Sequence, residues 1–154
     1  MINETILRVR YSETDQMGVV YYANYLVWME VGRTNLIREY GITYKELESK
    51  GYILPVVYVA GRYIKPCYYD DEVIVQSALM ETTLTKIRIG YKIYRVSEVG
   101  KELVFIGLTD LVFMDAKSGR VVKMPQFFRD SVKIGDTLEY RTFVEDIKRT
   151  LRVE

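Results

Sequence analysis

The sequence has no histidine at any of its 154 positions. This excludes serine and cysteine hydrolases that use a histidine base, zinc sites ligated by histidine, and dehydratase sites built from a histidine and a carboxylate. Any acid or base chemistry must therefore come from carboxylates, tyrosine, lysine or water.

Cysteine is nearly absent as well, since Cys67 is the only one. An internal disulfide and a cysteine metal cluster are both excluded, and we interpret Cys67 as a packed thiol. A glycine-rich loop of the P-loop or dinucleotide-binding kind is also missing. The sequence thus predicts no metal and no cofactor.

Long apolar runs and a strong net charge are missing too. No stretch approaches the roughly eighteen apolar residues of a membrane span, and no basic head followed by an apolar segment opens the chain. The net charge is only +1, and no long run of lysine and arginine offers contacts to phosphates. We expect a cytoplasmic protein that has no membrane span and binds no nucleic acid.

The length and the amide content add two weaker expectations. The chain has no repeat and no linker, so 154 residues predict one domain over residues 1–154. Asparagine and glutamine occur three times each, whereas 28% of the residues are charged. This composition is typical of thermophile proteins and favours a thermostable protein.

The most informative stretch that is present runs from Tyr11 to Tyr40. A polar turn precedes a helical pattern that we expect to begin near Tyr22 and to end before Gly41. Its first half is almost entirely apolar, which predicts a helix buried on all sides, whereas its second half has a solvated face. Gly32 lies in mid-helix, where glycine is unfavourable, so we expect a close contact with a strand there.

The rest of the chain alternates like strands joined by tight turns. Pro55 and Gly61 within one of these segments indicate an edge strand or a bulge, and Thr43 followed by Glu46 indicates the start of a short helix. Together these patterns predict an α+β fold in which an antiparallel sheet curls around the central helix. The expected strands are 5–11, 53–65, 72–82, 85–96, 102–114 and 120–124; a helical turn is expected at 125–129, and a helix at 139–152.

Asp15 is the foremost candidate for chemistry. It lies in the turn just before the expected helix start at Tyr22, where the first backbone N–H groups have no partner within the helix. Such groups, with the positive end of the helix dipole behind them, can bind a carbonyl oxygen that gains negative charge. The alternative is that Asp15 only forms an Asx turn or a cap.

Residues 11–25, which read YSETDQMGVVYYANY, resemble the signature of hotdog-fold acyl-CoA thioesterases of the 4-hydroxybenzoyl-CoA thioesterase type, including the YbgC-like branch. The resemblance covers residues 8–128 and leaves 132–154 as a C-terminal extension. Its further matching positions are Trp28, Glu30, Arg33, Thr34, Lys65, Pro66, Tyr69, Asp70, Asp71 and 125–128.

The resemblance implies a hotdog fold in which Asp15 is the catalytic carboxylate, either as nucleophile or as general base. It implies that the amide of Tyr22 polarises the thioester carbonyl, and that Gly18 and Val19 beside them bind substrate. YbgC-like members often have histidine at the position of Tyr22, so the preferred acyl group stays open. The implied assembly is a homodimer at least, and often a homotetramer.

Two further groups of polar residues have two interpretations each. Lys86, Arg88 and Lys92 share one strand face around Gly90, which fits either a patch for the phosphates of coenzyme A or an ordinary solvated face. Glu30 with Arg33 or Thr34 lies at helical spacing, either near the site and a subunit contact or as a structural pair.

The sequence therefore predicts a metal-free hydrolase that cleaves acyl-CoA, or the thioester of an acyl carrier protein, to the free acid and the thiol. Two alternatives stay open: a hydratase or dehydratase of acyl thioesters on the same fold, and a non-catalytic module that binds acyl thioesters.

Overall fold

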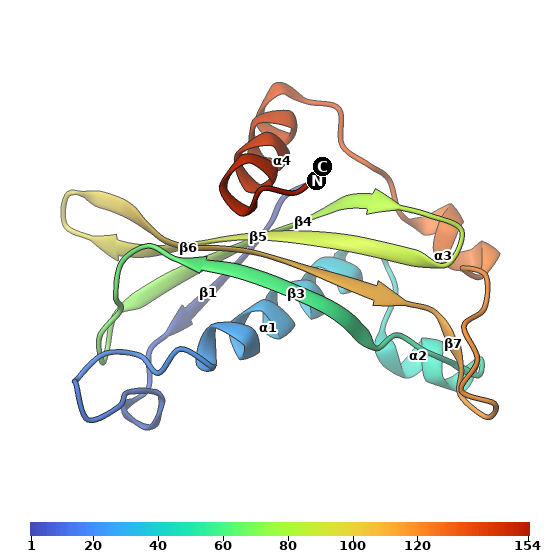
Figure 1. Cartoon of the computed structure of the whole chain (residues 1–154), viewed down its shortest axis with the longest axis horizontal. Helices are drawn as coiled ribbons and strands as arrows, with labels where there is room; N and C mark the ends of the chain where they lie inside the picture. The colour runs from blue at the N-terminus through green and yellow to red at the C-terminus, as the bar shows by residue number, and fades with distance from the viewer.

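The computed structural model describes all residues 1–154 and places one long helix against a curved antiparallel sheet (Figure 1). The sheet has the strand order β1-β4-β5-β6-β3. Helix α1 lies on one face, here called the inner face, and α4 lies on the opposite, outer face (Figure 1). The predicted α+β architecture, an antiparallel sheet around a central helix, is confirmed. The strands are β1 (Asn3–Arg8), β3 (Val56–Tyr63), β4 (Glu72–Thr82), β5 (Lys86–Ser97) and β6 (Gly100–Val112), and the helices are α1 (Asn24–Glu39) and α4 (Leu138–Leu151).

The remaining elements are short and lie at the two ends of the sheet. A 3-10 helix spans Tyr11–Glu13, and β2 (Tyr52–Ile53) pairs with β7 (Met114–Asp115). Helix α2 (Tyr44–Ser49) begins as predicted, with the hydroxyl of Thr43 accepting the Glu46 amide at 3.0 Å, and α3 spans Gln126–Ser131. The predicted strand 120–124 is wrong, because only Val121 forms a bridge, to Met114. None of the helices is long and apolar enough to cross a membrane.

Helix α1 begins two residues later than predicted, at Asn24. The preceding residues form a turn, in which the amide of Asn24 donates to the carbonyl of Tyr21 at 2.9 Å. The helix ends as predicted, because Gly41 has a φ of +90°, a left-handed conformation that glycine adopts without a Cβ clash.

The prediction that the first half of α1 is buried on all sides is wrong. Tyr25, Trp28 and Met29 form the buried face, whereas Leu26 and Val27 are 43% and 48% exposed. The sheet covers only one side of the helix, so apolar residues on its other side lie at the surface of the protomer. Uniform apolar composition therefore does not reveal which face the sheet covers.

Gly32 is the predicted point of close contact between α1 and the sheet, and the structure confirms it. A Cβ at this position would lie 2.5 Å from Oγ of Ser77 and 2.8 Å from Cγ1 of Val75, both on β4. Glycine lets the helix approach the sheet closely at this point, where a side chain would clash with β4.

Strand β3 occupies the edge of the sheet and has an irregular register between Val56 and Tyr58, so both features predicted from Pro55 and Gly61 are present. Its outer backbone edge has no strand partner. The adjoining side chains are apolar and half exposed: Val56, Val57, Tyr58 and Val59 are 42–54% exposed.

Helix α4, in the predicted C-terminal extension, packs its apolar face on the outer face of the sheet, and the predicted helix over 139–152 is confirmed. Tyr140 donates its hydroxyl to the carbonyl of Leu79 at 2.7 Å, and Lys92 pairs with Asp146 at 2.7 Å. These contacts hold the helix over the middle of the sheet. The second core cluster comprises Ala78, Met80, Ile106, Leu108, Tyr140, Phe143, Val144 and Ile147.

Candidate active site

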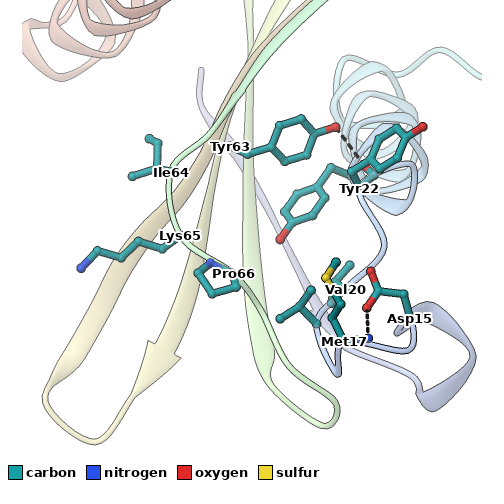
Figure 2. A pocket seen from close by; sticks show the side chains of 10 residues that line it. Asp15, Met17, Val20, Tyr22, Tyr63, Ile64, Lys65 and Pro66 are labelled. Carbon is teal, nitrogen blue, oxygen red and sulfur yellow. Dashed lines mark hydrogen bonds between the residues drawn. The ribbon is translucent and has the colours of Figure 1, made fainter.

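Asp15 lies in a tight loop that its own backbone closes. Its amide donates to the carbonyl of Val19 at 2.9 Å, and its carbonyl accepts the amide of Gly18 at 3.0 Å. Gly18 has a φ of +82°, which this turn requires. One carboxylate oxygen, Oδ1, accepts the Met17 amide at 2.8 Å, as in an Asx turn (Figure 2). The other oxygen forms no hydrogen bond or ion pair within the protomer, so the turn occupies half of the carboxylate and leaves the other half available.

The backbone N–H of Tyr22 is also available. Its neighbours are bonded: the Tyr21 amide donates to the carbonyl of Glu13, and the Asn24 amide to that of Tyr21. The Tyr22 amide has no acceptor in the protomer, although Tyr22 precedes the helix instead of opening it. The predicted free N–H is therefore present. It belongs to a turn before α1, although it was expected in the first residue of the helix.

Tyr63 fixes this turn from the neighbouring strand. Its hydroxyl donates to the carbonyl of Tyr22 at 2.9 Å, as the dashed line in Figure 2 marks. The rings of Tyr22 and Tyr63 meet edge to face at 6.4 Å, and Tyr25 and Tyr63 do so at 5.1 Å. The orientation of the free amide thus depends on β3 as well as on the loop.

Asp15 and Tyr22 line the same cavity, which has a volume of about 340 Å³. Most of its ten lining residues are apolar or aromatic, so a bound group meets mainly apolar side chains. Val19 also lines this cavity, whereas Gly18 shapes the loop without reaching it. The lining residues are Asp15, Met17, Val19, Val20, Tyr22, Tyr25, Tyr63, Ile64, Lys65 and Pro66.

Glu13 holds the loop against α1, and the sequence interpretation missed it. Its carboxylate is only 4% exposed and accepts the indole N–H of Trp28 at 2.9 Å and the amide of Arg10 at 2.8 Å. Its carbonyl accepts the side-chain amide of Asn24 at 2.8 Å. A buried tryptophan needs an acceptor for its N–H, and this requirement could have pointed to Glu13.

Burial keeps two ionisable groups near the loop, Cys67 and Tyr25, in their protonated forms. Burial raises the pKa of the Cys67 thiol to about 11, and burial also raises the pKa of the Tyr25 hydroxyl far above its ordinary value. Cys67 is fully buried, as its interpretation as a packed thiol requires. Among the aromatic residues near the loop, Tyr25 and Trp28 are buried, whereas Tyr21 is 45% exposed. Asp15 is thus the group at this cavity best suited to general-base work.

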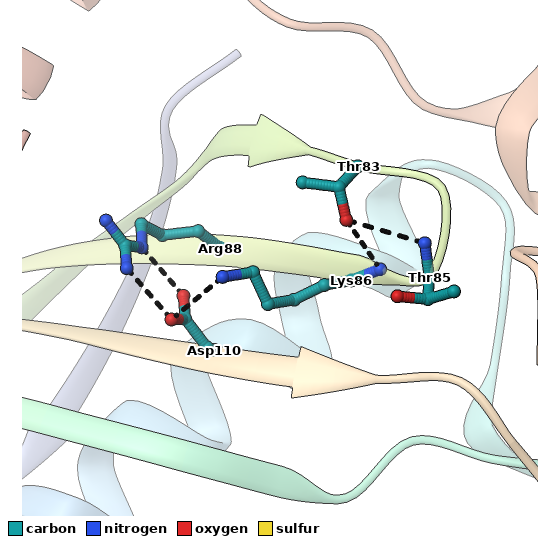
Figure 3. A network of polar contacts seen from close by, with 5 residues as sticks. All are labelled: Thr83, Thr85, Lys86, Arg88 and Asp110. Carbon is teal, nitrogen blue, oxygen red and sulfur yellow. Dashed lines mark hydrogen bonds and ion pairs between the residues drawn. The ribbon is translucent and has the colours of Figure 1, made fainter. Parts of the chain in front are cut away.

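Lys86 and Arg88 lie elsewhere, on the outer face of the sheet. Arg88 binds Asp110 on β6 through two hydrogen bonds of 2.7 and 2.9 Å, and Lys86 lies 3.4 Å from the same carboxylate (Figure 3). Burial raises the pKa of Asp110, but the two cations outweigh this and leave the pKa below its ordinary value. The ion pair between Arg88 and Asp110 explains why an aspartate interrupts the apolar pattern of β6.

The other two members of the predicted phosphate patch are separated from Lys86 and Arg88. Lys92 binds Asp146 of α4, and a Cβ at Gly90 would lie 2.5 Å from Sδ of Met80 and 2.7 Å from Cδ1 of Ile147. Met80 and Ile147 therefore cover Gly90, so a ligand cannot reach the backbone at this position. The cation that lines the cavity itself is Lys65, which lies 3.2 Å from Glu102.

Comparison with known proteins places this geometry in a family context. A family model described as the thioesterase-like superfamily matches residues 9–132. A curated relative, the putative acyl-CoA thioesterase YneP of Bacillus subtilis (strain 168), is 38% identical over 129 residues, which are 84% of this chain and 91% of the relative.

Solved structures agree with the fold. The DHNA-CoA thioesterase of Staphylococcus aureus superposes with a TM-score of 0.78 at 28% identity, over 97% of this chain and 94% of that one. The 4-hydroxybenzoyl CoA thioesterase of Pseudomonas sp. strain CBS-3 has a TM-score of 0.78 at 19% identity, over 85% and 99%, and shows the shared fold alone.

Proposed function

Because the chain belongs to the thioesterase-like superfamily, we propose that it hydrolyses acyl-CoA thioesters at the cavity between the Asp15 loop and α1. One observation carries the proposal: Asp15, which has an unoccupied carboxylate oxygen, and Tyr22, which has an unbonded backbone N–H, line the same largely apolar cavity. The resemblance to hotdog-fold thioesterases predicted this reaction class, and the matched family and relatives confirm it. The roles of single residues stay predictions.

In the proposed reaction the thioester oxygen accepts the N–H of Tyr22. The amide stabilises the negative charge that develops on this oxygen when the carbonyl carbon becomes tetrahedral. A C–O bond forms, the C–S bond breaks, and the thiolate of coenzyme A takes up a proton. Tyr63 fixes the carbonyl of Tyr22 and so orients the donor, and Lys65 adds a positive charge at the cavity.

Asp15 can serve in either of two ways. As a nucleophile its free oxygen attacks the thioester and forms an anhydride that water then opens; as a general base it takes a proton from the attacking water. A single turnover in ¹⁸O-labelled water separates the two. If water opens the anhydride at the carboxyl carbon of Asp15, the first molecule of acid is unlabelled and ¹⁸O enters Asp15. General-base catalysis gives labelled acid and leaves Asp15 unlabelled, and opening at the acyl carbon also labels the acid. Unlabelled acid, or ¹⁸O in Asp15, therefore identifies the nucleophilic route.

The function itself is tested by following thiol release from aromatic, short-chain and long-chain acyl-CoAs, with acyl carrier protein thioesters in parallel. We expect turnover of at least one class, with a preference that identifies the acyl group and its carrier. Release at the uncatalysed rate throughout would leave a binding module, and hydration of an enoyl-CoA without hydrolysis would identify a hydratase.

We also propose that the protein is at least a homodimer that pairs through β3. The outer edge of β3 has no strand partner, and its hydrophobic residues Val57 and Tyr58 are about half exposed. Helix α4 covers the middle of the outer sheet face, so a homotetramer needs a different contact. Light scattering should give a dimer, and Val57→Lys should produce monomers with reduced activity.

Lys86 and Arg88 stay proposed ligands for the phosphates of coenzyme A. They carry two positive charges against the single carboxylate of Asp110, so the patch keeps a net charge of one. The use of acyl carrier protein as an alternative carrier and the cytoplasmic location stay predictions as well.

A further inference from the structure

A second cavity, of about 260 Å³, lies beside the proposed active site along the same seam between α1 and β3. Leu26 and Met29 of α1 and Val56 and Val59 of β3 give it apolar walls. The first cavity is lined from the earlier part of α1 and the later part of β3, so the two follow one another along the helix.

Arg33 brings a positive charge into this cavity and lacks a matching partner. Its side chain is only 12% exposed, yet its Nε has no hydrogen-bond acceptor. Its one ion pair joins Nη2 to Glu30 at 3.8 Å, and the Glu30 carboxylate is 68% exposed. Arg88 is buried to a similar degree, with a side chain that is 14% exposed, and is fully paired by comparison. Its Nε and Nη2 donate to the carboxylate oxygens of Asp110 at 2.7 and 2.9 Å. Arg33 is therefore underpaired for its burial.

The groups around Arg33 are neutral hydroxyls, which can accept a hydrogen bond from the guanidinium but cannot balance its charge. The guanidinium lies beside the hydroxyls of Tyr44 and Tyr91. The Tyr91 hydroxyl is satisfied by Thr109 at 2.7 Å, but the buried hydroxyl of Tyr44 has no partner. A guanidinium with an adjacent hydroxyl is a match for a carboxylate, which accepts two parallel hydrogen bonds from arginine.

The position of Arg33 fits the far end of a substrate held at the first cavity. Eleven residues separate it from Tyr22, or about 16 Å along a helix axis, and helical side chains lean back toward the N-terminus. An acyl group whose carbonyl lies at the Tyr22 amide and whose chain follows α1 thus extends toward the guanidinium.

We infer that this second cavity binds a carboxylate at the far end of the acyl group, with Arg33 as the specificity residue, so that monothioesters of dicarboxylic acids are preferred substrates. The inference rests on the proposed function, because the thioester end is placed at Asp15 and Tyr22. In this inference the Glu30 carboxylate weakens substrate binding, because it competes with the substrate carboxylate for Arg33.

The test measures binding without turnover, on Asp15→Asn protein, by calorimetry. The probes are octanoyl-CoA and octanedioyl-CoA, which have the same length and differ only in the terminal carboxylate. We expect the carboxylate to improve Kd about tenfold or more, as a charge-assisted contact to a buried arginine does. Equal Kd values for the two probes would overturn the inference.

Two further substitutions in the same background assign the effect. Adding Arg33→Met should abolish the preference and leave octanoyl-CoA binding unchanged, whereas adding Glu30→Gln, at an exposed position, should strengthen the preference. An undiminished preference with Arg33→Met, or a weaker one with Glu30→Gln, would contradict the role of Arg33. The second variant decides the question if the first does not fold.

Hydrolysis by the wild-type protein separates this inference from the proposed function. Turnover of both probes with equal kcat/KM, dependent on Asp15, would remove the carboxylate preference and retain the thioesterase. Selective binding of octanedioyl-CoA without any turnover would have the opposite meaning: the cavity would stand as a binding site, and the proposed catalysis would fail.

Discussion

Polar groups on the outer face of the sheet have partners within the protomer, whereas two polar groups along the seam between α1 and β3 do not. On the outer face the cations are paired with carboxylates: Arg88 and Lys86 share Asp110, and Lys92 binds Asp146. Along the seam between α1 and β3, the Tyr22 amide and the Nε of Arg33 have no acceptor at all. Buried polar groups normally find partners, so paired groups indicate a structural role and unpaired ones indicate where a ligand binds.

The outer face and the seam are also built from different parts of the chain. The outer face is completed by α4, which comes from the extension beyond the matched family region, residues 9–132. The seam is built from α1 and β3, which lie within that region. The extension thus finishes the core, and the family region carries the proposed chemistry.

Asp15→Asn should have the largest effect on activity. The amide oxygen of asparagine can still accept the Met17 N–H, so we expect the loop to keep its shape while kcat falls by about 10²-fold or more. Asp115→Asn is the matched control, because Asp115 closes a similar turn with the amides of Lys117 and Ser118. Near wild-type thiol release from the Asp15 variant would remove this residue from the mechanism.

Gly32→Leu should have the largest effect on stability. The new side chain would meet Ser77 and Val75, and overpacking of this kind costs about 1–3 kcal/mol. Urea unfolding followed by circular dichroism measures the loss. Arg38→Ala, at an exposed position of the same helix, should change little; equal stability of the two variants would contradict the close contact at Gly32.

Tyr63→Phe should have an intermediate effect, and mainly on kcat. The substitution removes the hydrogen bond to the carbonyl of Tyr22 and keeps the ring contacts, so a loss of about 1 kcal/mol, or severalfold in rate, is expected. KM should change less. Tyr58→Phe, on the same strand with no hydrogen bond from its hydroxyl, is the control, and an equal loss there would argue against positioning by Tyr63.

The ion pairs of the outer face should make the stability of the fold depend on pH in the acid range. The hydrogen bond and charge of Lys92 keep the pKa of Asp146 below its ordinary value, and Asp110 is shifted in the same direction by Arg88 and Lys86. A depressed carboxyl pKa stabilises the fold above the unfolded value of about 4 and ceases to do so as pH falls through the folded value. The stability of the wild type should therefore drop more steeply below pH of about 4 than that of Asp146→Asn, as thermal melts at several pH values would reveal. The exposed neighbour substitution Glu145→Gln should leave the wild-type slope in place.

Lys86→Gln should have the smallest effect. Arg88 keeps its two hydrogen bonds to Asp110, so the fold should be unchanged, and the KM for acyl-CoA should rise only about twofold to fivefold. The KM for a short thioester that lacks the nucleotide should not change, and neither should that for acyl-CoA after Lys123→Gln. Equal changes for the two substrates would assign Lys86 to structure, like the rest of the outer face.

Much of the fold follows from local pattern. The alternation of Ile87, Ile89, Tyr91 and Ile93 predicted β5, the cap at Thr43 predicted α2, and the mid-helix glycine predicted the contact with β4. These predictions succeed because neighbours along the chain determine which face is apolar and where a helix begins or ends.

Predictions that depended on partners far apart in the sequence succeeded less often. Arg33 lies in the half of α1 that was expected to have a solvated face, but its side chain is only 12% exposed and lies beside Tyr44 and Tyr91. Gly90 lies on the strand face that was interpreted as either a phosphate patch or an ordinary solvated face, but Ile147 of α4 packs on it. Leu26 and Val27 are apolar like their buried neighbours, yet no element of the protomer covers them.

The sequence by itself determined the class of reaction, because the motif around Asp15 resembles that of acyl-CoA thioesterases, and the absence of histidine left carboxylates, tyrosine, lysine or water for acid and base chemistry. The tertiary structure alone decided which polar groups are satisfied, because hydrogen bonds such as those of Glu13 with Trp28, Tyr63 with Tyr22, and Arg88 with Asp110 join residues 15 or more positions apart. The donors and acceptors that remain without a partner are the ones that can bind a ligand, and local sequence pattern does not reveal which ones these are.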